Sequence, residues 1–178
     1  MSDTGPDQIA SLDPTVLNRV LWKIPNVLCL IGSAAAGEWN GMTASWVTQV
    51  SMEPVLVGAS IEASAVTNRL IREGGSFSVN LWDRADTRTF VKFSKPATRG
   101  DNSLNDRPIR MGTSGVPIFE EAVAWIECSL YHTVPLGHHD LFIGEVIGAG
   151  FRDDVDDPEV ARIEDTRMKY GGVKRGGH

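Results

Sequence analysis

Short apolar runs separated by turn-forming residues dominate the first third of the chain. Three such runs, residues 26–33, 42–51 and 54–61, contain several β-branched residues and are bounded by Gly, Asn or Pro. This pattern is typical of strands. The segment 37–41 has a glycine at each end, so it predicts a turn and a hairpin between the first two strands.

The same pattern continues in the second half. Residues 76–82 alternate Phe, Val and Leu with Ser and Asn, as expected of a strand. Two longer runs, 122–136 and 140–152, predict a pair of strands. The segment 137–139, Gly-His-His, predicts the turn between them.

Helical spacing of apolar residues occurs in three places. Residues 15–23 predict a short helix. Residues 64–75 predict a second helix, with Ser64 as the N-cap and two glycines at its end. Residues 84–94 predict a third helix, with an aspartate just before it and a proline just after it.

Four segments lack periodicity. Residues 97–117 are rich in Gly, Pro, Asn and Asp and predict a long irregular connection. The acidic segment 153–165 predicts a solvated loop or helix. Residues 1–14 predict a flexible arm, and residues 166–178 predict a basic, glycine-rich tail that is mobile at its end.

The predicted fold is mainly β (α+β). About six strands, antiparallel because their connections are short, and two or three short helices favour a split barrel over a doubly wound sheet. No linker or repeat divides residues 1–178, so we expect a single domain.

Composition excludes several functional classes. The chain has 178 residues, a net charge of -6 and 42% hydrophobic residues, which is ordinary for a globular protein without a nucleic-acid-binding face. The first residues are polar and acidic, and no apolar run is long enough for a membrane span, so we expect a cytoplasmic protein. Cys29 and Cys128 lie in apolar runs and are expected to be buried thiols, and no ligand spacing predicts a metal site.

Four features are candidates for a site. The start of the helix near Ser64, with Thr67 in its first turn, offers free N–H groups to an anion, although plain helix capping is the alternative. Residues 40–51 contain more hydroxyl and amide groups than a half-buried strand requires. His139 follows a turn, and two lysines near residue 94 serve either the helix dipole or a phosphate.

These segments, in this order, resemble the flavin reductase-like family, whose members have an FMN-binding split β-barrel. The resemblance runs from about Arg19 to about Arg152 and is closest to the branch that includes flavoredoxin-like proteins and reductase components of monooxygenases. It is carried by NGMTASWVTQVSMEP, ASAVTNRLIREGGSFSVNLW, FVKFSKPA and AWIECSLYHTVPLGHHDLFIGEV.

The resemblance implies roles for individual residues. The implied cofactor-binding residues are Asn40, Met42, Thr43, Ala44, Ser45, Trp46, Ser60, Ser64, Thr67, Asn68, Lys92, Lys95 and Tyr170. Lys95 is the alternative to Lys92 as the basic residue beside the flavin. His139 is implied near the nicotinamide or the flavin edge, and His138 replaces an acidic residue usual in the family. The segment around Tyr170 matches poorly.

The implied activity is hydride transfer from NADH or NADPH to FMN, with FAD as an alternative flavin. The family also implies a homodimer and the supply of reduced flavin to a partner oxygenase, such as a monooxygenase component, or to another acceptor such as oxygen or iron. Two alternatives remain open at this point. One is a non-enzymatic FMN-binding electron carrier of the flavoredoxin type, and the other is a different split-barrel flavoenzyme.

Overall fold

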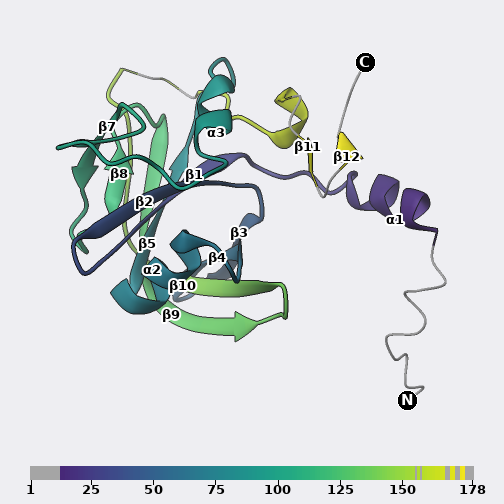
Figure 1. Cartoon of the computed structure of the whole chain (residues 1–178), viewed down its shortest axis with the longest axis horizontal. Helices are drawn as coiled ribbons and strands as arrows, with labels where there is room; N and C mark the ends of the chain where they lie inside the picture. The colour runs from purple at the N-terminus through teal and green to yellow at the C-terminus, as the bar shows by residue number, and fades with distance from the viewer. Residues whose placement is uncertain (1–12, 155, 157, 167–168, 171–172, 175–178) are drawn as a thin grey trace.

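One antiparallel sheet of seven strands forms the body of the protein (Figure 1). The computed structural model describes residues 13–154, 156, 158–166, 169–170 and 173–174. The strand order is β2-β1-β5-β9-β10-β4-β3. The seven strands are β1 (Cys29–Ala35), β2 (Glu38–Ala44), β3 (Val47–Met52), β4 (Val55–Glu62), β5 (Ser76–Leu81), β9 (Ala124–Pro135) and β10 (His139–Phe151).

Shorter elements surround this sheet. In the described residues, a three-stranded sheet and a two-stranded sheet accompany it, together with three α-helices and a 3-10 helix. These elements are α1 (Pro14–Leu21), α2 (Val66–Gly74), α3 (Arg88–Lys92), β6 (Ser103–Leu104), β7 (Arg107–Met111), β8 (Pro117–Phe119), η2 (Ile163–Asp165), β11 (Lys169–Tyr170) and β12 (Val173–Lys174). The prediction of a mainly antiparallel β fold with short helices is confirmed.

The two edge strands of the main sheet are consecutive in the chain. Only Ser45 and Trp46 connect the end of β2 to the start of β3. Three Cα–Cα steps span at most about 10–11 Å. The sheet must therefore curl until its two edges approach each other, which is the geometry of a split barrel. The prediction of one continuous strand over 42–51 is wrong, because the chain crosses this split.

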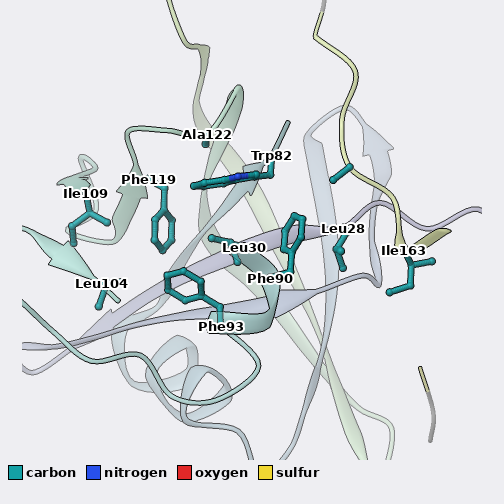
Figure 2. Packing of buried hydrophobic residues seen from close by; sticks show 11 residues of the cluster. Leu28, Leu30, Trp82, Phe90, Phe93, Leu104, Ile109, Phe119, Ala122 and Ile163 are labelled. Atoms are coloured by element: carbon teal, nitrogen blue, oxygen red, sulfur yellow. The ribbon is translucent and has the colours of Figure 1, made fainter. Parts of the chain in front are cut away.

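The first five residues of β1 are buried on both faces, which explains the apolar run that opens the strand. Leu28 and Leu30 belong to one core cluster, and Cys29 and Ile31 belong to another. Figure 2 shows the first cluster, in which Trp82 lies above Phe90 of α3, Phe93 at the end of that helix and Phe119 of β8. The thiols of both cysteines are buried as predicted, and burial raises the pKa of each to about 12.

The polar face of β5 binds the strand packed against it. Ser78 Oγ donates to the carbonyl of Pro117 at 2.6 Å. Asn80 Oδ1 accepts from the amide of Phe119 at 3.0 Å, and its Nδ2 donates to Leu30 O at 3.1 Å. The alternation in β5 therefore separates two buried faces, one apolar and one hydrogen-bonded.

The segment 97–117 is more regular than predicted. It contains β6 and β7, and reaches β8, and the three strands pair antiparallel. Ile109 and Leu104 from this sheet enter the core cluster of Figure 2. The strands were missed because all three are short, and β7 and β8 contain proline, so they have neither the length nor the alternation of a recognisable strand.

Helix boundaries differ from the predicted ones. The N-cap of α2 is Ala65, not Ser64, and no side chain caps it. Gly75 ends α2 in the left-handed conformation, as expected of a C-cap glycine. α3 covers only the middle of the predicted segment 84–94. α1 has no buried residue and lies apart from the barrel (Figure 1).

The remaining predictions have mixed outcomes. The β1–β2 turn consists of Ala36 and Gly37, both with positive φ, so most of the predicted turn 37–41 is strand. Within the acidic segment 153–165, Ala161 and Ile163 are buried, so it is not simply solvated. Residues 1–12 of the predicted arm and 175–178 of the tail lie outside the described residues.

Candidate functional site

The split between β2 and β3 brings Trp46 to the surface beside the β9–β10 turn. The Trp46 side chain is 43% exposed, and its ring centroid lies 4.9 Å from that of His139, with the planes tilted by 56°. The carbonyl of Trp46 accepts from the amide of Ser60 on β4 at 2.9 Å. Three elements thus meet where the barrel is open.

The start of α2 lies next to the same turn. The amide of Ala63 donates to the carbonyl of His138 at 3.0 Å. The hydroxyl of Ser64 is exposed and donates to Glu62 Oε1 at 2.7 Å, so it does not cap the helix. Because no side chain accepts from the first-turn amides, this helix end retains the donors and positive dipole that favour an anion.

Asn40 and Thr67 form a buried link between β2 and α2. Asn40 Nδ2 donates to Thr67 Oγ1 at 2.9 Å, and Asn40 Oδ1 accepts from the amide of Ala97 at 2.8 Å. Thr67 is fully buried. Its hydroxyl therefore points into the protein, and Asn40 joins Ala97 to the first turn of α2.

Ser33 lies opposite Asn40 in the β1–β2 register. Its hydroxyl is buried and has no hydrogen-bond partner among the described residues. A buried hydroxyl without a partner is unusual in a native structure. It adds a further polar group to the buried region beneath α2.

Asn68 is engaged by β10. Its Nδ2 donates to Asp140 Oδ2 at 2.8 Å, and its Oδ1 accepts from Arg72 Nε at 3.1 Å. Arg72 also forms an ion pair with Asp140 at 2.7 Å. Hydrogen bonds from Arg72 and Asn68 hold the pKa of Asp140 below its ordinary value. This network fixes α2 against the strand that begins at His139.

His139 is half-buried and electrostatically disfavoured as a cation. Burial, followed by the neighbouring charge of His138, lowers the pKa of His139. Glu62, which lies opposite His139 in the β4–β10 register, and Asp140 act in the other direction. The imidazole is thus kept neutral at a lower pH than an ordinary histidine.

The other predicted residues of β2 form hydrogen bonds or packing contacts within the protein. Thr43 Oγ1 donates to Phe90 O at 2.8 Å, and its amide donates to Phe93 O at 3.0 Å. Ala44 is buried in the second core cluster, and Met42 packs against it. What this strand can still offer a ligand is the half-buried Ser45 and the backbone beside it.

The two predicted lysines lie on the surface after the middle of α3. Lys92 and Lys95 are exposed, and the carbonyl of Lys92 accepts from Asn105 Nδ2 at 2.9 Å. Lys95 lies two residues before Ala97 and so is the lysine closer in sequence to the Asn40 contact. The side chain of Tyr170 lies outside the described residues.

A hollow of about 330 Å³ lies elsewhere on the barrel, and none of the predicted site residues lines it. Its lining includes Arg110, Phe119, Trp125, Phe151 and Arg152. Of the sequence-predicted residues, Trp46, Ser60 and His139 meet instead at the split. Among the described residues, no group of three His, Cys, Asp or Glu side chains is placed to hold a metal ion.

Sequence reasoning missed several residues that shape the site. Glu62, Arg72, Asp140 and Ala97 each contact a predicted residue, yet each looks like an ordinary surface or loop position in the sequence. Asp140 does directly follow the two histidines of the turn, which was the one available signal. In the part of the chain that the structure describes, no helix is long and apolar enough to cross a membrane.

Known proteins are similar to this chain in sequence or in structure. NADH-dependent flavin reductase StyB of Pseudomonas fluorescens is 30% identical over 126 residues, which are 70% of this chain and 70% of that protein. BorF, the flavin reductase component of a bacterial two-component tryptophan halogenase, is 25% identical, with a TM-score of 0.68 over 79% of this chain and 89% of BorF. An FMN-binding protein from Thermus thermophilus with bound 1-cyclohex-2-enone is 27% identical, with a TM-score of 0.66 over 77% of this chain and 80% of that one.

The family assignment covers most of the protein. A family model described as flavin reductase like domain matches residues 21–171, which include every strand of the main sheet, the split and the β9–β10 turn. The chain belongs to the flavin reductase like domain family.

Proposed function

We propose that this protein is a flavin reductase that oxidises NADH or NADPH and binds its flavin along the split between β2 and β3. The observation that carries the proposal is the meeting of Trp46, the uncapped start of α2 and His139 at this opening. These elements come from three distant parts of the chain. An apolar surface, a set of anion-binding amides and a polar edge group are thereby placed side by side.

The groups present fit the chemistry of FMN. The exposed face of Trp46 offers apolar surface to a flat ring. The first-turn amides of α2 offer donors to a phosphate. Lys95, two residues before the Ala97 that Asn40 links to Thr67 of α2, is proposed to add positive charge there. Ser45, Ser60 and Ser64 are the hydroxyls proposed to face the ribityl chain. FAD remains the alternative, because the phosphate site is open to solvent at Ser64.

Most of the remaining predicted residues are proposed to position the elements around the flavin instead of contacting it. Asn40, Thr67 and Asn68 are proposed to hold the phosphate-binding helix in place, since their polar groups bond to β2 and β10. Met42, Thr43 and Ala44 set the path of the strand into the split. Lys92 and Tyr170 stay candidates for contacts at the edge of the site.

A bound flavin supplies the hydride-accepting chemistry itself, so the protein needs no general acid or base for that step. The contribution of the chain is to hold the two reactants in contact and to limit the access of water. Trp46 and His139 are placed to form one side of such a contact. This accounts for a site built from a tryptophan, a histidine and backbone amides.

The protein is proposed to deliver reduced flavin to an oxygenase or another flavin-dependent partner. Support comes from BorF, which is named as a component of a two-component halogenase. We also propose a homodimer. The apolar side chains left exposed on the described surface, including Met52, Phe151 and Val20, are suited to contacts with a second copy.

Anaerobic mixing of the purified protein with FMN or FAD and either nucleotide tests the proposal. Loss of the flavin absorption near ~450 nm is expected with at least one nucleotide. Trp46→Ala tests the proposed site: this variant is expected to react more slowly while the protein stays folded. Bound flavin that neither nucleotide reduces would instead support an electron carrier, and bound pyridoxal phosphate or deazaflavin would identify a different split-barrel enzyme.

A further inference from the structure

Two histidine side chains face each other at the β9–β10 turn. His138 Nδ1 lies 3.2 Å from His139 Nδ1, and the ring centroids are 5.1 Å apart. Two imidazole nitrogens at this distance are stable only if one carries a proton and the other offers its lone pair. The pair therefore shares one proton along this contact.

The exposure of the two rings indicates which one donates. His138 is exposed, whereas His139 is half-buried between His138 and the ring of Trp46. Burial lowers the pKa of His139, so a positive charge on the pair is disfavoured on that ring. The favoured arrangement is His138 Nδ1–H donating to the lone pair of His139 Nδ1.

We propose that His138 is a positioning residue that fixes the tautomer and orientation of His139. With its Nδ1 occupied as an acceptor, a neutral His139 must carry its proton on Nε2. It then offers a hydrogen-bond donor on the side of the ring away from His138. Resting on the proposed function, this donor serves the carboxamide of the nicotinamide or a carbonyl oxygen of the flavin ring.

The carboxylates near the two histidines have other partners, so they do not fix the tautomer of His139. Glu62 faces His139 from β4, but Ser64 Oγ donates to its Oε1. Asp140 is bound by Arg72 and Asn68 from α2. Within the described residues, neither carboxylate forms a hydrogen bond or ion pair with His139. In the described part of the chain, the side-chain hydrogen bond found at the His139 imidazole is the one with His138.

A second proton on the pair breaks the arrangement. With both rings cationic, two N–H groups face each other and the Nδ1–Nδ1 contact is lost. Because burial and the charge of His138 lower the pKa of His139, this happens at a lower pH than for an isolated histidine. Activity is therefore expected to fall on the acid side as the pH drops through that pKa.

The first test is kinetic and uses three variants. His138→Ala removes the donor, and loss of one hydrogen bond corresponds to a rise in KM for the nucleotide of about 3–10-fold. His138→Asn keeps an N–H near the same place and is expected to restore KM to within about 2-fold of the native value. Both variants are expected to move the acid limb of the rate to higher pH. His132→Ala, an exposed histidine on β9, is the control and should change neither quantity.

The second test needs neither flavin nor turnover. Nitrogen-15 spectra of the imidazoles in the flavin-free protein, assigned with His138→Ala and His139→Gln, report which nitrogen carries the proton. At about pH 8, where ordinary histidines are neutral, His139 is expected as the Nε2–H form in the native protein and as a mixture in His138→Ala.

Each result has a distinct meaning. An Nδ1–H form of His139 in the native protein overturns the proposal. So does a His138→Ala variant with unchanged tautomer, KM and acid limb. If neither nucleotide reduces the flavin, the proposed function fails, and the spectra still decide the role of His138.

Discussion

The side-chain amide of Asn40 donates to the hydroxyl of Thr67 at 2.9 Å, and both side chains are buried. This contact joins the strand that enters the split to the first turn of the helix proposed to bind phosphate. Thr67 therefore anchors the first turn of that helix to β2. Ser64, three residues earlier, is exposed and bonds only to Glu62 among the described residues.

Replacing Thr67 with valine is expected to lower the free energy of unfolding by about 1–3 kcal/mol, because Asn40 Nδ2 is left buried without its partner. Urea denaturation of the flavin-free protein measures this. Thr67→Ser keeps the hydroxyl and is the matched control. Ser64→Ala is expected to leave stability within about 0.5 kcal/mol of the native value. Equal stabilities of Thr67→Val and Thr67→Ser would contradict the buried contact.

Trp46 is expected to contribute to flavin affinity more than to stability. Its side chain is 43% exposed, so truncation to alanine removes little from the core. Loss of an aromatic contact with the flavin ring corresponds to about 3–10-fold weaker binding. Quenching of flavin fluorescence on binding gives the dissociation constant. Tyr131→Ala removes a comparably exposed aromatic from β9 and should bind flavin normally; equal weakening in both variants would place the flavin elsewhere.

Lys95 is expected to bind the phosphate of the flavin through its positive charge. The residue lies two positions before Ala97, whose amide binds Asn40, and Asn40 in turn binds Thr67 in the first turn of α2. Lys95→Gln is expected to weaken FMN binding by about 3–10-fold at low salt and to leave riboflavin, which lacks the phosphate, unchanged. Lys92→Gln is the comparison. If Lys92→Gln weakens FMN binding but not riboflavin binding, and Lys95→Gln changes neither, the phosphate-binding lysine is Lys92.

The parts of the fold that the sequence predicts are those with a strong local period. The alternation in residues 76–82 and the run DLFIGEV give strands, and the glycine pair after residue 73 ends α2. The break at Ser45 and Trp46 has no such signal, because it arises from the curl of the whole sheet. Ser64 has the chemistry of an N-cap, yet its hydroxyl bonds to Glu62, a competition that propensity alone does not reveal.

The site is predictable to a smaller degree. Trp46 and His139 are far apart in the sequence, and only the sheet order brings them together. The family resemblance led to both residues, but not to their contact. Asn68 is a further example, since the acceptor of its amide is Asp140, which the sequence marks only by its place after the two histidines of the turn. Polar residues chosen by resemblance include both surface groups and buried supports, and burial separates the two sets.

Asp140 is expected to make stability depend on pH below about 5. The guanidinium of Arg72 and the amide of Asn68 hold the pKa of Asp140 below its ordinary value of 3.8. A lowered folded-state pKa contributes stability that is fully present above the unfolded value and is lost as the pH falls through the folded one. Asp140→Asn removes the charge, so the variant should be less stable than the native protein at pH 6–7 and should lose less on acidification. Urea denaturation at a series of pH values measures both curves. Asp101→Asn, at an exposed position of the loop after α3, is the control and should follow the native curve. Parallel curves for Asp140→Asn and the native protein would show that the network between α2 and β10 does not depend on the charge of Asp140.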